Sequence, residues 1–334
     1  MDHSDHCHAE PSGPKIGRKL QIVSGIFLIV LAASFLQPLT PLNQSLLDYL
    51  SIIWWAVLLG LLIGGCIDYF VPDGFLIRFL GQKRKRTLLY AVLAGFMMSA
   101  CSHGILAIAI QLYKKGASVP AVITFLLASP WANLPITILL FGFFGWKAVL
   151  FILGAMVIAL TTGLAFTALD RAGLIEGSNP QAEAGDVEWR NVQNFDFRLA
   201  INGVTAGALS LANMVLWWIL IGVMLAALIG AYVPQHMFMD YLGPDWAGIL
   251  LTLLFATILE VCSEGTSPIA FEIFNKTGVL GNPFVFLMAG VATDYTEIGL
   301  LWSNIGRRTA IWLPIITVPQ IVLFGYALNI FVAA

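Results

Sequence analysis

Runs of about 20 apolar residues, separated by short polar stretches, recur along almost the whole chain. An α-helix needs about 20 apolar residues to cross the hydrocarbon core of a bilayer, whereas a barrel strand alternates apolar and polar positions. The pattern therefore predicts an all-α polytopic membrane protein with about nine transmembrane helices. The predicted helices cover residues 20–36, 47–71, 88–113, 119–144, 149–169, 208–233, 249–274, 283–302 and 310–332.

Composition and charge support a multi-pass protein of the inner (plasma) membrane. Hydrophobic residues make up 59% of the chain and charged residues 11%, against about a quarter charged in soluble domains. Basic residues in short loops stay cytoplasmic, so the KRKR cluster at 83–86 predicts a cytoplasmic loop. If every segment crosses the membrane once, the N-terminus is cytoplasmic too, although Lys114 and Lys115 do not fit this orientation. Residues 15–36 also resemble a signal peptide, but "LAASFLQ" fits a cleavage site poorly.

The chain contains an internal repeat. Residues 101–145 and 262–306 align without a gap at an offset of 161, and both blocks begin with Cys-Ser-x-Gly. Such self-similarity is typical of transporters built from two related bundles. It predicts a His-rich cytoplasmic tail (1–19), an unpaired helix (20–45), a first repeat (46–169), a polar linker (170–198) and a second repeat (199–334), each repeat with four segments. Whether the repeats are parallel or inverted stays open.

Two pairs of helix breaks are predicted at matched places in the repeats. One pair lies at the Cys-Ser-x-Gly blocks, where the second repeat adds Pro268, which removes a helix hydrogen bond. The other pair lies at "ASPWANLP" and "AGVATDYTE", so that Asn133 corresponds to Asp294. Transporters use such broken or re-entrant segments near the membrane midplane to expose backbone groups to a substrate.

Ionisable and thiol side chains gather at these predicted breaks. An ionisable group in the hydrocarbon region is costly and normally marks an ion or substrate path, and a histidine beside carboxylates suits proton relay. The alternative for each cysteine is simple packing, which is our interpretation of Cys66, and Glu272 is interpreted as lying near the membrane interface. The predicted substrate-binding residues are Cys101, Ser102, His103, Asn133, Cys262, Ser263, Glu264 and Asp294, and the predicted coupling residues are Glu260, Glu264, Asp294 and Glu297.

The N-terminal stretch "MDHSDHCHAEP" contains His3, His6, Cys7 and His8. Imidazole and thiolate groups at this density can bind a soft or borderline metal ion. A polar tail without fixed structure is the alternative.

Several functions are excluded or not expected. No Gly-x-x-x-x-Gly-Lys-Ser/Thr motif is present, so the chain carries no ATPase of its own. No catalytic signature is found either, so we expect neither an enzyme nor a cofactor. The expected partners are a small-molecule or metal(loid) substrate, the lipid bilayer and protons as a coupling ion. Nucleic acid is not expected, and a homo-oligomer is left open.

The block "AGFMMSACSHGILAIAIQLYKKGASVPAVITFLLASPWANLP" and its echo "VFLMAGVATDYTEIGLL" resemble the predicted permease family that includes the ArsP-type organoarsenical efflux permeases. The resemblance implies secondary efflux of trivalent organoarsenicals such as methylarsenite, whereas a related branch is associated with export of divalent metals. Arsenical permeases typically carry adjacent cysteines, but this chain has one cysteine in each repeat block. A permease for Zn, Cu or Hg, or a non-transporting membrane subunit of a larger complex, therefore remains an alternative.

Overall fold

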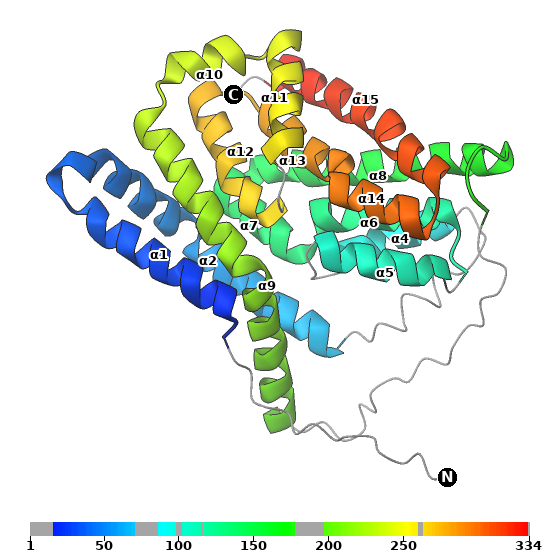
Figure 1. Ribbon diagram of the computed structural model, residues 1–334, viewed down its shortest axis with the longest axis horizontal. Coiled ribbons are helices and arrows are strands. Elements are labelled where there is room, and N and C mark those ends of the chain that lie inside the picture. Colours follow the sequence, from blue (N-terminus) through cyan, green and yellow to red (C-terminus); the bar gives the residue numbers. More distant parts are fainter. Residues whose placement is uncertain are drawn as a thin grey trace.

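The computed structural model describes residues 16–70, 86–97, 102–114, 116–177, 197–259 and 263–332, and these ranges contain helices and no strands (Figure 1). Two short 3-10 helices, η1 (Gln37–Leu39) and η2 (Gly145–Lys147), accompany the α-helices. The α-helices are α1 (Arg18–Ser34), α2 (Thr40–Phe70), α4 (Arg86–Met97), α5 (Ser102–Lys114), α6 (Val119–Ala132), α7 (Leu134–Phe144), α8 (Ala148–Arg171), α9 (Phe197–Tyr232), α10 (Gln235–Tyr241), α11 (Trp246–Leu259), α12 (Ser263–Thr277), α13 (Gly281–Thr293), α14 (Tyr295–Asn304) and α15 (Arg307–Phe331).

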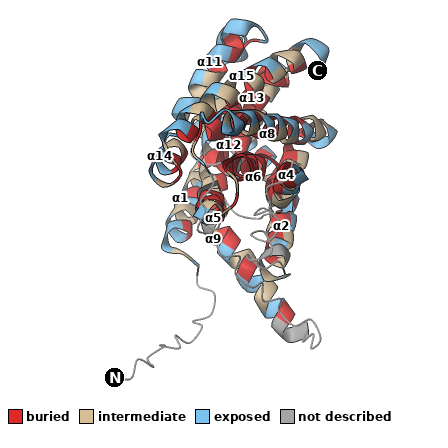
Figure 2. Ribbon diagram, turned by 90° about the vertical axis from the view of Figure 1, so that its right-hand side faces the viewer, coloured by how far each residue is buried: buried red, intermediate tan, exposed pale blue. Residues whose placement is uncertain are grey.

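Helices α6 and α13 form the centre of the molecule. Every residue of α6 is buried, as are residues 281–292 of α13, and the two helices contact each other. Both helices are apolar all round, which is typical of a helix enclosed by others. Helices α4, α5 and α8 pack around α6, and α11, α12 and α15 pack around α13. Figure 2 shows α6 as a buried helix surrounded by the others.

The contacts between the two halves follow a matched pattern. Helix α2 packs against α9, and α8 packs against α15. Two further contacts between the halves correspond to each other. Helix α5 of the first half touches α14 of the second, and α7 of the first half touches α12 of the second. Such a correspondence is the arrangement that two similar bundles related by a pseudo-twofold axis produce. The repeat itself remains a prediction from the sequence.

The predicted number of nine spans is not confirmed. Among the described residues, five segments are long and apolar enough to cross a membrane, or six if α10 and α11, which are bent by 103°, count as one span. Helices α4, α5, α11 and α12 contain 12 to 15 residues. At 1.5 Å per residue each is about 18 to 23 Å long, shorter than a hydrocarbon core of about 30 Å. The predicted spans 88–113 and 249–274 are thus each found as two short helices.

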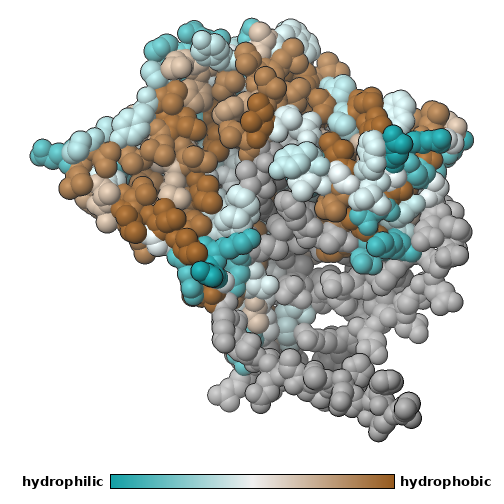
Figure 3. Space-filling model, in the orientation of Figure 1, coloured by the Kyte–Doolittle hydropathy of each residue, from teal (hydrophilic) through white to brown (hydrophobic). Residues whose placement is uncertain are grey.

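The outer surface is largely apolar. Many large hydrophobic side chains are exposed on α1, α2, α9, α11 and α15, and apolar side chains cover much of the face seen in Figure 3. A soluble monomer rarely exposes apolar patches of this extent, so this surface fits contact with lipid. Helix α1 packs along α9, where the backbone N–H of Gly17 donates to Asn213 Oδ1 at 2.7 Å.

Candidate functional site

The first break in a buried helix lies at Asn133. Helix α6 ends at Ala132 and α7 begins at Leu134, and Asn133 between them is extended (φ −64°, ψ 159°) and 1% exposed. Its Oδ1 accepts a hydrogen bond from the backbone N–H of Ile136 at 2.8 Å, which is an N-cap of α7. A buried helix start needs such a partner because its first N–H groups have none within the helix.

The second break lies at Asp294 and repeats this geometry. Helix α13 ends at Thr293 and α14 begins at Tyr295, and Asp294 leaves the helical conformation (φ −57°, ψ 118°). Its Oδ1 accepts from the backbone N–H of Thr296 at 2.7 Å and from the Thr296 hydroxyl at 2.5 Å. The breaks predicted at Asn133 and Asp294 are therefore confirmed.

The two caps differ in charge. Asn133 presents a neutral amide, whereas Asp294 presents a carboxylate at the N-terminus of α14, where the helix macrodipole favours negative charge. Glu297 lies in the first turn of the same helix and is 1% exposed. Two acidic residues thus lie within one turn in the interior of the protein, and such a pair can hold a cation or a proton.

The helices that carry the predicted thiol blocks lie next to these capped helices. Helix α5 begins directly after Cys101 and contacts α14, which Asp294 caps. Helix α12 begins directly after Cys262 and contacts α7, which Asn133 caps. Each helix that follows a cysteine block thus contacts the capped helix of the other half.

Several predicted site residues cannot be placed in this geometry. Residues 98–101 and 260–262, and with them Cys101, Glu260 and Cys262, lie outside the described residues. The same holds for the side chains of Ser102, His103, Ser263 and Glu264, although their backbones are helical. The break at each cysteine and the pairing of His103 with Glu264 stay predictions.

The first turn of α12 is held directly against the backbone of α9. A Cβ atom on Gly222 of α9 would overlap the carbonyl oxygen of Gly265, the glycine of the second Cys-Ser-x-Gly block. Only a residue without a side chain allows this approach. Gly222 therefore allows the start of α12 to lie directly against α9. The Cys-Ser-x-Gly motif by itself does not predict this contact.

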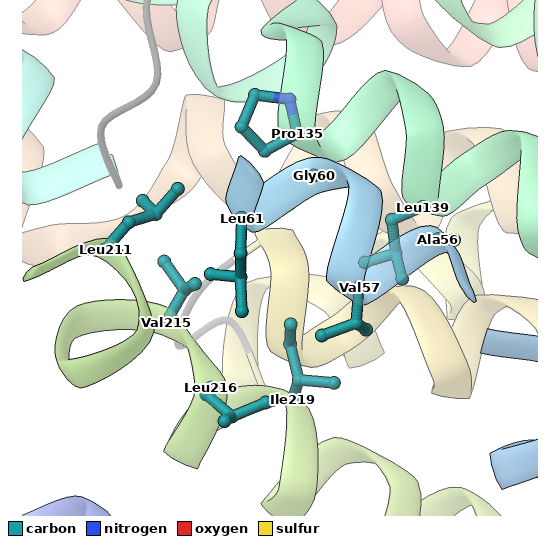
Figure 4. A pocket seen from close by; sticks show the side chains of 10 residues that line it. All are labelled: Ala56, Val57, Gly60, Leu61, Pro135, Leu139, Leu211, Val215, Leu216 and Ile219. Carbon is teal, nitrogen blue, oxygen red and sulfur yellow. The ribbon is translucent and has the colours of Figure 1, made fainter. Parts of the chain in front are cut away.

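A small apolar cavity lies beside the Asn133 break, where α2, α7 and α9 meet (Figure 4). Gly60, Pro135 and Val215 are among its lining residues, and its volume is about 20 Å³. That volume holds about one water molecule, but an ordered water needs two or more polar partners, which this lining does not offer. The cavity is a gap in packing and not a substrate site.

One buried ionisable group, Glu272, is not among the predicted site residues. Glu272 on α12 was interpreted as lying near the membrane interface, but it is only 5% exposed and bonds to Tyr49 of α2. The sequence contains one signal for this buried pair, which is the (i, i+4) spacing of Glu272 and Lys276 within an apolar stretch.

The described residues contain no group of three or more His, Cys, Asp or Glu side chains arranged to hold a metal ion. The tail residues His3, His6, Cys7 and His8 lie outside the described residues, so their metal binding stays a prediction. Cys66 is half-buried in α2 and fits the packing role expected for it.

Membrane-length apolar segments and a buried helix core interrupted by polar caps define a helical membrane transport protein. Residues 39–330 match the ArsP_1 family, whose members are described as predicted permeases, and the chain belongs to this family.

Three relatives illustrate the membership. The UPF0718 protein YcgR of Bacillus subtilis is 25% identical over 296 residues, which is 88% of this chain and 97% of the relative. A "Putative permease" of Mycobacterium tuberculosis is 27% identical, covering 64% of this chain and 58% of the relative. A "Putative two-component membrane permease complex subunit" of Streptococcus mutans is 24% identical, covering 77% and 86% respectively. No solved structure matches the chain.

Proposed function

We propose that the protein is a proton-coupled efflux permease for a soft metalloid, with trivalent organoarsenicals such as methylarsenite as its substrate class. The observation that carries the proposal is the pair of polar breaks at Asn133 and Asp294, each beside the helix that follows a cysteine of the other half. Broken helices at a repeat interface are where transporters of this kind bind substrate.

Cys101 and Cys262 are the proposed ligands. Methylarsenite carries two hydroxyl groups on arsenic, and each can exchange for a thiol with release of one water molecule. Two cysteines would thus bind one arsenic atom, in keeping with the preference of soft centres for sulfur. Asn133, Ser102 and Ser263 would hydrogen-bond the two arsenic hydroxyl groups before they are exchanged for the thiols.

The acidic residues have a separate role in the proposal. Asp294 and Glu297, with Glu260, Glu264 and His103, would bind the protons that drive export. Buried carboxylates are costly inside a membrane, and a coupling role explains why the chain retains Asp294 and Glu297 in its interior.

The proposal is tested in everted membrane vesicles under a proton gradient, where export appears as uptake. The substrates are methylarsenite, arsenite, Zn²⁺, Cu⁺ and Hg²⁺, and the variants are the parent, the Cys101→Ser/Cys262→Ser double variant and Cys66→Ser as a matched control. We expect gradient-dependent uptake of methylarsenite, reduced about tenfold or more in the double variant (about 1.4 kcal/mol) and unchanged in Cys66→Ser. Uptake at the parent rate by the double variant would overturn the thiol role.

Two other functions are outcomes of the same experiment. Thiol-dependent uptake of Zn²⁺, Cu⁺ or Hg²⁺ in place of methylarsenite would make the protein a metal permease. A non-transporting subunit is also considered, because the Streptococcus mutans relative is named as one subunit of a two-component complex. Purified protein that moves no substrate in liposomes, although vesicles from its host do, would support that function.

A further inference from the structure

A second polar cluster lies between α2, α9 and α12, centred on Glu272. Tyr49 Oη donates a hydrogen bond to Glu272 Oε2 at 2.5 Å and lies 3.4 Å from the carbonyl oxygen of Pro268. Lys276 Nζ lies 3.7 Å from Glu272 Oε1 and donates to the carbonyl oxygen of Gly230 at 2.9 Å. The carboxylate is thus held by a neutral donor on one side and a cation on the other.

The surroundings of the cluster are closely packed and aromatic. The rings of Phe143, Phe144, Phe271 and Phe274 contact one another beside the cluster, and the Tyr49 ring contacts Phe143 and Phe271. A Cβ atom on Gly230 would lie only 2.9 Å from Glu272 Oε1, so the absence of a side chain there makes room for the carboxylate. The lysine side chain is 20% exposed and therefore reaches the edge of this packing.

Few ionisable groups face Glu272. Helices α7 and α13 pack against α12 and contain no ionisable residue. Lys147 of η2 lies over the Phe274 ring, with its Nζ 4.9 Å from the ring centroid. Among the described side chains near this end of α2, α9 and α10, the ionisable residues Asp48, Tyr232, His236, Asp240 and Tyr241 are exposed. Tyr49 and Lys276 therefore set the electrostatic environment of Glu272.

The fold does not require this cluster. At the offset of 161, Glu272 corresponds to Gln111, which is exposed. At the offset of 163, which aligns Trp54-Trp55 with Trp217-Trp218, Tyr49 corresponds to Ala212. A buried ion pair adds little net stability, because desolvation offsets the attraction of the charges. An ionisable group at such a position in a membrane protein points to a function.

We propose that Glu272 is a proton-binding site of the permease, separate from the substrate residues at the helix breaks. This inference rests on the proposed function and adds a residue to its coupling step. A proton taken up by the carboxylate gives a neutral carboxylic acid and leaves the Lys276 ammonium without its counter-charge. It also weakens the bond from Tyr49, because that bond is no longer charge-assisted. Both changes favour movement of Lys276 toward water and looser packing of α12 against α2.

The position of Glu272 on α12 links this event to the substrate. Glu272 lies nine positions after Ser263, the first residue of α12, which is about 14 Å along the helix axis. Cys262 directly precedes that helix, and α12 contacts α7, which Asn133 caps. A shift of α12 upon protonation would therefore move the segment that follows one of the proposed thiol ligands.

The test compares two kinds of transport by purified protein in liposomes. Gradient-driven accumulation of methylarsenite requires proton binding, whereas exchange of substrate at equal pH does not. In Glu272→Gln the amide oxygen still accepts from Tyr49, so α12 stays attached, but no proton can bind. We expect Glu272→Gln to lose accumulation about tenfold or more while exchange stays within about twofold of the parent. Gln111→Ala, at the matched exposed position, should change neither.

Tyr49→Phe separates proton binding from a purely structural role. It removes the bond to α2 but keeps the carboxylate, so we expect accumulation to persist with a shifted pH profile. Equal loss of accumulation and exchange in both Glu272→Gln and Tyr49→Phe would overturn the proposal, as would accumulation by Glu272→Gln at the parent rate.

A measurement without substrate keeps this test independent of the proposed substrate. Infrared difference spectra of the parent, recorded between an acidic and an alkaline pH, should show a protonated carboxyl band that Glu272→Gln lacks. Absence of any such difference would overturn proton binding at Glu272. Failure of the parent to move methylarsenite would overturn only the substrate.

Discussion

Asn133 and Asp294 are both buried and each caps the helix that follows it, and 294 − 133 gives the repeat offset of 161 between them. One cap is an amide and the other is a carboxylate, although both accept a hydrogen bond from the first turn of the following helix. The geometry is thus shared by the two halves, whereas the charge belongs to one half only. A capping role can therefore be separated experimentally from a role in transport.

Asp294→Asn should keep the cap and remove the charge. Because asparagine is about as good an N-cap as aspartate, we expect the free energy of unfolding to fall by no more than about 1 kcal/mol, the contribution of a charge at a helix N-terminus. If Asp294 binds a proton or substrate, uptake into everted vesicles should fall about tenfold or more. Thermal unfolding in detergent and vesicle uptake check the two parts.

Asp294→Ala is the comparison variant, because alanine removes both the charge and the cap and should therefore lose stability as well as transport. Transport by Asp294→Asn at the parent rate would contradict a role for the charge.

Gly222→Ala should push α9 and α12 apart. The added methyl group would overlap the backbone oxygen of Gly265, which cannot turn aside as a flexible side chain can. Overpacking of this kind costs about 1 to 3 kcal/mol, so we expect a clear drop in the melting temperature and loss of transport. Gly25→Ala on α1, where no atom lies within 4 Å of the added group, should leave stability unchanged or slightly raised. Equal melting temperatures for the two variants would contradict the close approach.

The breaks in the buried core could be predicted because their cause is local. Asn133 has Pro130 and Pro135 nearby, and the repeat aligns it with the second polar interruption at Asp294. Proline and capping residues act on their own helix, so the sequence contains this information.

The number of spans and the burial of Glu272 could not be predicted in the same way. An apolar run does not say whether one helix continues through it, and residues 88–113 contain both α4 and α5. The burial of Glu272 depends on Tyr49, which is 223 positions away, and on the space left by Gly230 of α9. Such contacts arise only from the packing of distant helices.

Asn282→Ala should destabilise the packing of α13 against α11 and α15. The Asn282 amide donates to the carbonyl oxygens of Leu242 and Gly243 and to Thr252, and its oxygen accepts from Asn329. Leaving buried polar groups without partners costs about 1 to 3 kcal/mol for each group, so we expect a loss of at least about 2 kcal/mol in unfolding free energy. Asn304→Ala, whose hydrogen bonds are exposed, is the control and should cost less than about 0.5 kcal/mol. Similar losses in both variants would contradict the importance of the buried network.

Glu176 should make stability depend on pH, because its carboxylate caps α15 from the loop after α8. Its oxygens accept from the backbone N–H groups of Arg308 and Thr309, both at 2.9 Å, and from the Thr309 hydroxyl at 2.7 Å. Burial alone would raise the pKa of Glu176, but these hydrogen bonds outweigh it and hold the pKa below its usual value. A lowered pKa in the folded state means that the stabilisation is present above the unfolded pKa and is lost as the pH falls through the folded pKa.

Glu176→Gln removes this charge, so we expect the parent to be about 1 kcal/mol more stable than the variant near neutral pH. The difference should shrink toward zero as the pH falls from about 5 through the lowered folded-state pKa of Glu176. Thermal unfolding of both proteins in detergent across this range measures it. A difference between parent and Glu176→Gln that stays constant as the pH falls would show that the charge of Glu176 is not what stabilises the start of α15.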